Sequence, residues 1–275
     1  EITLNNADSL IKATGACTID NDLTFSADSN SGKGLDLDAN VVISGNITMS
    51  ADPILDFNTN TILYQGTAVD VGANTLTFLG SGKFDNSGNN FNLNHADSII
   101  DISGSTVSNV NQGTTSNANK GITIRKSAAT ITTFTSGAGS RIDLGANLTV
   151  TDDFNLGANT MILSGTNTLD GGEITLNNAD SLIQATEACT IDNNLDFTAD
   201  SNTGKGLDFN DDVTLSGDIT MSADPIFDFA ANTVLYQGTA VDVSANTLTL
   251  LGSGTFDNSG NNFNLNRATS LIKLS

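Results

Sequence analysis

The sequence predicts an all-β fold, a parallel β-helix (β-solenoid) of stacked short strands with no helices, and two observations lead to it. The first is a duplication: residues 1–100 align without a gap with 173–272 and are identical at 77 of 100 positions. The second is a finer period, in which apolar residues at i and i+2 recur about every eight to ten residues. Such short alternation is the signal of a strand, and the i, i+3, i+4 stripes of helices are missing.

The duplication sets the expected domain organisation. The repeat is 172 residues long, so 1–172 is one copy and 173–275 is a partial second copy. We expect 1–275 to form a single continuous solenoid, because short strands that alternate with tight turns stack coil upon coil. With about 19 residues in each coil, the chain would make about 14 coils, spaced by about 4.8 Å.

The strands are expected at the apolar pairs, and the corners at polar clusters between them. The pairs of the first copy are Ile2/Leu4, Leu23/Phe25, Leu35/Leu37, Ile47/Met49, Ile62/Tyr64, Val69/Val71, Leu76/Phe78 and Phe91/Leu93. Turn residues gather at 29–34 and 85–90. The phrase Ala-Asn precedes several strands, with the Asn at Asn40, Asn74, Asn119, Asn147, Asn159, Asn232 and Asn246. Because Asn tolerates the left-handed conformation, we expect these residues to form sharp corners or to stack as ladders.

One stretch interrupts this pattern. Residues 103–120 are nearly devoid of large apolar side chains. They predict a loop that protrudes from the solenoid, and loops on rigid scaffolds often carry binding sites. A plain surface excursion is the alternative.

Composition and charge limit the function classes. The net charge is −21 and only ten residues are Lys or Arg, so we expect no nucleic-acid partner. No run of 18 apolar residues occurs, and we expect no membrane insertion in this segment. The chain does not begin with Met and shows no signal peptide, which we interpret as a processed product or a segment of something longer.

The two cysteines occupy one position of the repeat. Cys17 and Cys189 lie 172 residues apart, or about 40 Å along a solenoid with one strand every 4.8 Å. A disulfide needs Cα atoms within about 7 Å, so the two do not pair within one solenoid. Each is expected to be a small buried apolar residue.

Catalytic patterns fail one after another, and we expect no enzyme and no cofactor. His95 stands alone, and Arg267 replaces it in the second copy, so no Ser-His-Asp or Cys-His arrangement can be built twice. Neither HExxH nor CxxC occurs, which gives no indication of zinc. Many parallel β-helices degrade polysaccharides, and a site near Arg125, Lys126 and Arg141 stays open as an alternative.

Calcium is the one metal with candidate ligands. Oxygen-bearing side chains alternate at Asp36, Asp38 and Asn40, and again at Asp208, Asn210 and Asp212. This resembles the opening of an EF-hand loop, but the Gly at position six and the Glu at position twelve are missing. Acidic residues on the outward side of a strand are the alternative explanation.

The chain has a distinctive sequence pattern, which is seen in the phrases Gly72-Ala-Asn-Thr-Leu-Thr-Phe78, Gly145-Ala-Asn-Leu-Thr-Val150, Gly157-Ala-Asn-Thr-Met-Ile-Leu163 and Gly171-Gly-Glu-Ile-Thr-Leu176. It resembles the parallel β-helix passengers of bacterial autotransporters and the filamentous-haemagglutinin-like adhesins. The resemblance implies a secreted, elongated protein with an adhesive or structural role, located outside the cell or on its surface.

These observations favour an extracellular structural protein, a stalk or filament subunit that assembles head to tail through open strand edges. The alternative is a surface adhesin that binds a glycan or a host or cell-surface protein through its repeated outward faces or through 103–120. A polysaccharide-degrading enzyme comes third.

Overall fold

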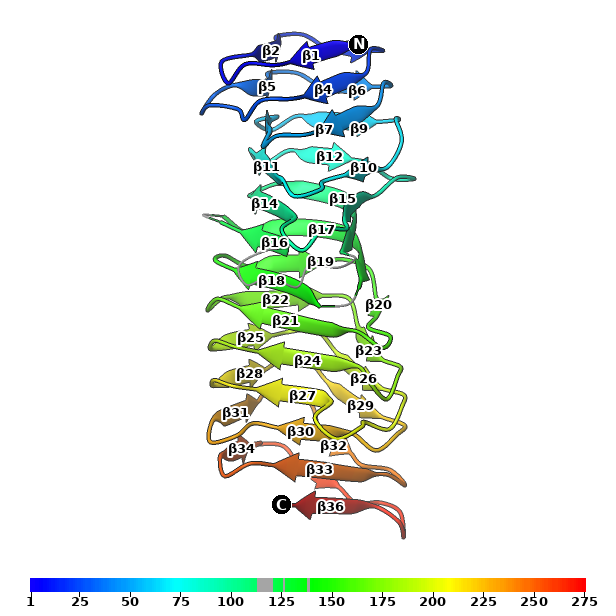
Figure 1. Cartoon of the computed structure of the whole chain (residues 1–275). Coiled ribbons are helices and arrows are strands. Elements are labelled where there is room, and N and C mark those ends of the chain that lie inside the picture. The colour runs from blue at the N-terminus through cyan, green and yellow to red at the C-terminus, as the bar shows by residue number, and fades with distance from the viewer. Residues whose placement is uncertain (113–120, 126, 138) are drawn as a thin grey trace. The chain divides into compact units, whose positions relative to one another are not determined.

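The computed structural model describes residues 1–112, 121–125, 127–137 and 139–275 (Figure 1). Every regular element in these residues is a strand, and the all-β parallel solenoid predicted from the sequence is confirmed. The chain divides into two compact units, Glu1–Phe134 and Thr135–Ser275, and each is described by itself. The single continuous solenoid expected for 1–275 stays a prediction.

The first unit stacks its strands in parallel sheets. Its strands are β1 (Ile2–Leu4), β2 (Leu10–Ala13), β3 (Cys17–Ile19), β4 (Leu23–Phe25), β5 (Gly34–Leu37), β6 (Val41–Ile43), β7 (Ile47–Met49), β8 (Ile54–Asp56), β9 (Thr61–Tyr64), β10 (Val69–Asp70), β11 (Thr75–Leu79), β12 (Lys83–Asp85), β13 (Phe91–Leu93), β14 (Ile99–Ser103), β15 (Thr106–Gln112) and β16 (Gly121–Ile124). One sheet has the order β2-β5-β8-β11-β14-β16, a second β3-β6-β9-β12-β15 and a third β1-β4-β7. β13 pairs with both β10 and β15, and β17 (Ala129–Ser136) crosses the unit boundary.

The second unit follows the same plan. Its strands are β18 (Ser140–Leu144), β19 (Leu148–Val150), β20 (Phe154–Asn155), β21 (Thr160–Ser164), β22 (Thr168–Gly171), β23 (Ile174–Leu176), β24 (Leu182–Ala185), β25 (Cys189–Ile191), β26 (Leu195–Phe197), β27 (Gly206–Phe209), β28 (Val213–Leu215), β29 (Ile219–Met221), β30 (Ile226–Asp228), β31 (Thr233–Tyr236), β32 (Val241–Asp242), β33 (Thr247–Leu251), β34 (Thr255–Asp257), β35 (Phe263–Asn264) and β36 (Leu271–Leu274). The sheet orders are β18-β21-β24-β27-β30-β33-β36, β19-β22-β25-β28-β31-β34, β20-β23-β26-β29 and β32-β35.

Coils are longer than the sequence period suggested. Paired residues are separated by 24 positions between β2 and β5 (Leu10 with Gly34) and by 20 between β5 and β8 (Leu35 with Leu55). The solenoid therefore has about 12 coils, close to the 14 expected. The corners absorb the extra residues, and corner length is not visible in the spacing of the apolar pairs.

The interior of each unit is a stack of aromatic and aliphatic side chains. In the first unit, the ring of Phe78 lies 5.5 Å from that of Phe84 and 5.4 Å from that of Phe91, measured between ring centroids. In the second unit, Phe197 lies 5.3 Å from Phe227 in the same way. Tilted and edge-on contacts at these separations stabilise beyond simple burial.

Among the described residues, glycine makes most of the left-handed corners, and Asn58, Ala230 and Ser244 make the others. Gly72 and Gly157 have φ values of 60° and 61°, whereas none of the described Ala-Asn residues has a positive φ. The left-handed corners expected at those Asn residues are therefore wrong; their side chains bond to backbone instead. The amides of Asn74 and Asn159, for example, donate to backbone carbonyl oxygens three residues earlier, each at 2.9 Å. Asn119 lies outside the described residues.

Carboxylate and amide oxygens hold successive coils together at the corners. The Asp22 carboxylate accepts the backbone N–H of Asn46 at 2.8 Å, and the Asn46 side chain accepts that of Thr67 at 3.0 Å. The second unit repeats the series through Asn194, Asp218 and Thr239, at 2.9 and 2.8 Å. Part of the negative charge therefore satisfies corner N–H groups that the strands leave unpaired.

The loop predicted for 103–120 is wrong for its first part. Residues 106–112 form β15, in which Val107 pairs with Phe84 and Val110 pairs with Phe91. Asn109 lies at the corner between these pairs, where the buried Asn86 side chain bonds both its N–H and its carbonyl. Residues 113–120 lie outside the described residues.

Candidate functional site

Two shallow grooves occupy equivalent places in the two copies of the repeat. One crosses β3, β6 and β9 and has a volume of about 470 Å³; the other crosses β25, β28 and β31 and has a volume of about 410 Å³. The first is lined by Ala16, Cys17, Thr18, Asn40, Val41, Val42, Thr61 and Leu63. The second is lined by Thr166, Ala188, Cys189, Thr190, Asp212, Val213, Thr214, Thr233 and Leu235. Apart from Thr166, each residue of the second groove lies 172 positions after one of the first.

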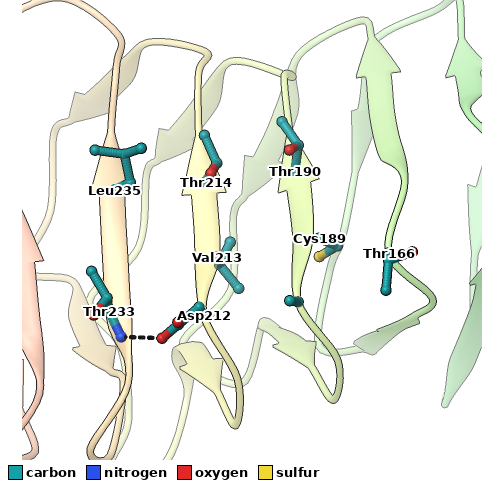
Figure 2. A pocket seen from close by; sticks show the side chains of 9 residues that line it. Thr166, Cys189, Thr190, Asp212, Val213, Thr214, Thr233 and Leu235 are labelled. Carbon is teal, nitrogen blue, oxygen red and sulfur yellow. Dashed lines mark hydrogen bonds between the residues drawn. The ribbon is translucent and has the colours of Figure 1, made fainter.

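The floor of the groove is made by strand residues whose side chains face outward. In the second copy, Thr190 pairs with Thr214, which pairs with Leu235, and the three lie in a row across neighbouring strands (Figure 2). The corresponding row of the first copy ends at Leu63, whose side chain is exposed. The face offers hydroxyl and methyl groups, which suit contact with another surface better than proton transfer.

The polar residue at the end of each groove is engaged by backbone. The carboxylate of Asp212 accepts the N–H of Thr233 at 2.6 Å (Figure 2), and the Asn40 side chain accepts the N–H of Thr61 at 2.8 Å. Both are corner acceptors between successive coils. The backbone N–H of Asn210 donates to the carbonyl oxygen of Ala185 in the preceding coil, at 2.9 Å.

The remaining calcium candidates have protein partners. Asp36 and Asp38 both reach the ammonium group of Lys12, at 2.7 and 3.1 Å, and these hydrogen bonds raise the pKa of Lys12. In the second copy the Asp208 carboxylate accepts a hydrogen bond from the Gln184 amide at 2.7 Å. Within the described residues, no group of three or more His, Cys, Asp or Glu side chains is placed to hold a metal ion.

The two cysteines differ although their sequences match. Cys189 is buried, and burial raises the pKa of its thiol to about 12. Cys17 is exposed, so the buried position expected from the sequence is wrong for this copy. The reason lies in the neighbouring coil: β25, which contains Cys189, has β22 on one side and β28 on the other, whereas β3 is the first strand of its sheet.

The described basic residues and the single histidine have local partners. Arg125 lies 3.2 Å from the carboxylate of Asp101, and the His95 ring accepts the backbone N–H of Asp97 at 3.1 Å. Arg141 belongs to the second unit and also has interaction partners. Lys126 lies outside the described residues.

The grooves were not anticipated from the sequence. Their residues come from three coils, and they meet only when the register between strands is known. No family model, curated protein or solved structure matches this chain. None of the elements in the described ranges is a helix long and apolar enough to cross a bilayer.

Proposed function

We propose that this chain is an extracellular structural element, a stalk or filament subunit whose molecules associate end to end through the open edges of their outermost coils. The observation that carries the proposal is apolar exposure at those coils. Ile2 and Leu10 are 37% and 41% exposed in the first coil, and Leu271 and Leu274 are 51% and 75% exposed in the last. Most such side chains elsewhere in the strands are buried.

Open edges of parallel strands pair readily with other strands. A head-to-tail contact uses two different surfaces, so it does not close on itself and generates an open fibre. The net charge of −21 opposes this association, because like charges on successive molecules repel each other. Assembly should therefore increase with salt concentration, which screens the repulsion. The extracellular location rests on the resemblance to bacterial surface β-helices.

Electron microscopy and sedimentation of the purified chain, over a range of protein and salt concentrations, test the proposal. Fibres or a growing series of oligomers are expected. Leu274→Lys should suppress them, whereas Leu63→Lys, a matched change at an exposed leucine on a lateral face, should leave them intact. Dispersed short rods at every concentration would refute the filament.

A second candidate function is adhesion, and the repeated groove favours it. Two copies of one Thr- and aliphatic-lined surface would allow bivalent binding of a glycan or a cell-surface protein. Binding to immobilised glycans and to cells should fall when Thr18 and Thr190 are both replaced by Lys. Equal binding by the double variant and the parent chain would remove the grooves from consideration.

A further inference from the structure

One sheet of the first unit is interrupted between two successive coils. The sheet of β1, β4 and β7 ends at β7, and β10, the next strand on that face, pairs only with β13 among the described strands. β7 and β10 lie next to each other, but no strand pairing joins them. We call this step between the coil of β7 and the coil of β10 the seam.

The other two faces of the seam are paired in the usual way. β8 pairs with β11, with Leu55 opposite Phe78, and β9 pairs with β12, with Ile62 opposite Phe84. In the preceding step all three faces are paired, through β4 with β7, β5 with β8 and β6 with β9. Because each parallel pair contributes a ladder of backbone hydrogen bonds, the seam lacks one ladder of three.

The corner before β10 is longer than the equivalent corners before it. Three residues, 20–22, separate β3 from β4, and three residues, 44–46, separate β6 from β7. Four residues, 65–68, separate β9 from β10. An extra residue on one side of a ladder disrupts the pairing locally, which accounts for the interruption.

A tyrosine hydroxyl bridges the seam where the ladder is missing. The hydroxyl of the buried Tyr64 accepts the N–H of Ile47, at the start of β7, at 3.2 Å. It donates to the carbonyl of Thr67, in the corner before β10, at 2.7 Å. Burial raises the pKa of Tyr64, so the hydroxyl keeps the proton that it donates. In the preceding step the equivalent N–H, that of Leu23, donates directly to the Asn46 carbonyl at 2.8 Å.

A groove of about 300 Å³ lies over the seam. Residues 46–49 line it from the side of β7, and Thr67, Ala68 and Asp70 line it from the side of β10. The surface is therefore hollowed at the place where the two coils share no ladder.

The second unit has the same interruption at the same place of the repeat. The sheet of β20, β23, β26 and β29 ends at β29, and β32 pairs only with β35 among the described strands. β30 with β33 and β31 with β34 remain paired. The corner before β32 again has four residues, 237–240, and Tyr236, the copy of Tyr64, is buried. Each seam has further coils on both of its sides, so neither depends on an outermost coil.

We infer that each seam is a hinge, at which two successive coils separate on one face while the hydrogen bonds of the other two faces keep them joined. Hinges concentrate a change of shape in a few residues at the ends of regular elements. The Tyr64 hydroxyl is the latch that holds the first hinge closed. The hinge goes beyond the proposed structural role, because it lets a unit bend without unfolding a coil.

The reactivity of a buried thiol measures opening of the seam. Val69 in β10 and Val107 in β15 are 1% and 0% exposed, and β15 is paired with β12 on one side and β17 on the other. Each is changed to cysteine in the full chain with Cys17→Ser, which removes the exposed thiol; burial raises the pKa of the remaining Cys189 thiol to about 12. Val69→Cys should react with a chromogenic thiol reagent at least about tenfold faster than Val107→Cys, because a buried thiol reacts only after local opening. Equal rates would overturn the hinge.

Tyr64→Phe tests the latch. The loss of two hydrogen bonds across the seam should make Val69→Cys react about fivefold faster or more. The matched control is Ile122→Val, a change at a buried residue of the same unit that lowers global stability by a similar amount. It should leave the rate at Val69→Cys within about twofold of the parent. Equal acceleration by both substitutions would show that Val69→Cys reacts through global unfolding, and the hinge would be refuted.

Hydrogen exchange provides a readout that needs no substitution. The N–H of Ile47 faces the seam, whereas the N–H of Val69 faces β13 and donates to the Asn90 carbonyl at 2.9 Å. Both residues begin a strand. The N–H of Ile47 should exchange about tenfold faster than that of Val69, and slower exchange at Ile47 would count against the hinge.

The hinge and the filament are scored separately. Both hinge measurements use dispersed chains at low protein concentration, so they do not depend on assembly. Fast reaction of Val69→Cys in a chain that never forms fibres refutes the filament alone. Fibres from a chain in which Val69→Cys is as protected as Val107→Cys refute the hinge alone.

Discussion

A pair of neighbouring core residues has exchanged identities between the two copies. Phe78 pairs with Leu55 in the first unit, and both side chains are fully buried. At the equivalent positions of the second unit, Leu250 pairs with Phe227. The combined volume is unchanged, so we expect the site to require one aromatic and one leucine in either order, and the two substitutions to compensate each other.

The test is a double-mutant cycle in the first unit. Phe78→Leu leaves a cavity and should lower the free energy of unfolding by about 1–2 kcal/mol. Leu55→Phe forces a larger ring into filled space and should cost about 1–3 kcal/mol. The double variant reproduces the second unit and should lie within about 1 kcal/mol of the parent, which corresponds to a coupling of at least about 1 kcal/mol.

Urea unfolding followed by circular dichroism measures each free energy. Costs that add to within about 0.5 kcal/mol would refute the compensation. The reciprocal exchange, Phe227→Leu with Leu250→Phe, is the matched control and should show coupling of the same sign.

Four further predictions concern corners, backbone contacts and pH. Ala230 has a φ of 49° where the first copy carries Asn, so Ala230→Asn should raise the urea midpoint by the equivalent of about 0.5–1 kcal/mol; a lower midpoint would contradict this. A Cβ on Gly217 would lie 2.1 Å from a backbone oxygen of the preceding coil. Gly217→Ala should therefore lower the free energy of unfolding by more than about 2 kcal/mol or abolish soluble expression. Unfolding like that of the parent chain would contradict this. The Tyr64 hydroxyl donates to one backbone carbonyl at 2.7 Å and accepts one backbone N–H at 3.2 Å, so Tyr64→Phe should cost about 1–2 kcal/mol by the same unfolding measurement. The hydrogen bond from the Ser87 hydroxyl holds the pKa of Asp85 below its usual value. The stability that the ionised Asp85 contributes is therefore present above about pH 4 and is lost as the pH falls through the folded-state pKa. Asp85→Asn should flatten that part of the pH profile of the urea midpoint.

The strands were predictable because inward residues repeat at i and i+2. Leu23/Phe25 and Ile62/Tyr64, for example, lie in β4 and β9. The length of a coil was not predictable, because corners of variable length separate strands without changing their apolar pattern.

The burial of a side chain could not be predicted from the sequence where that burial depends on a neighbouring coil. Cys17 and Cys189 have nearly the same local sequence, and their opposite exposure comes from what stacks on them. The strand β15 could not be recognised from its sequence, because the buried polar residues Ser108 and Gln112 interrupt the expected alternation of apolar and polar residues. The grooves depend in the same way on residues of three coils.

The way each coil bonds only to the coil before it and the coil after it has a mechanical consequence. Tension applied at the ends of a unit would load the hydrogen bonds of one coil at a time, since strands lie across the direction in which coils accumulate. Each released coil of 20 to 24 residues would lengthen the chain by about 65–85 Å at 3.3–3.6 Å per residue. Under tension such a protein would unfold coil by coil in steps of nearly equal length, and it would absorb work over a long extension instead of unfolding at a single force.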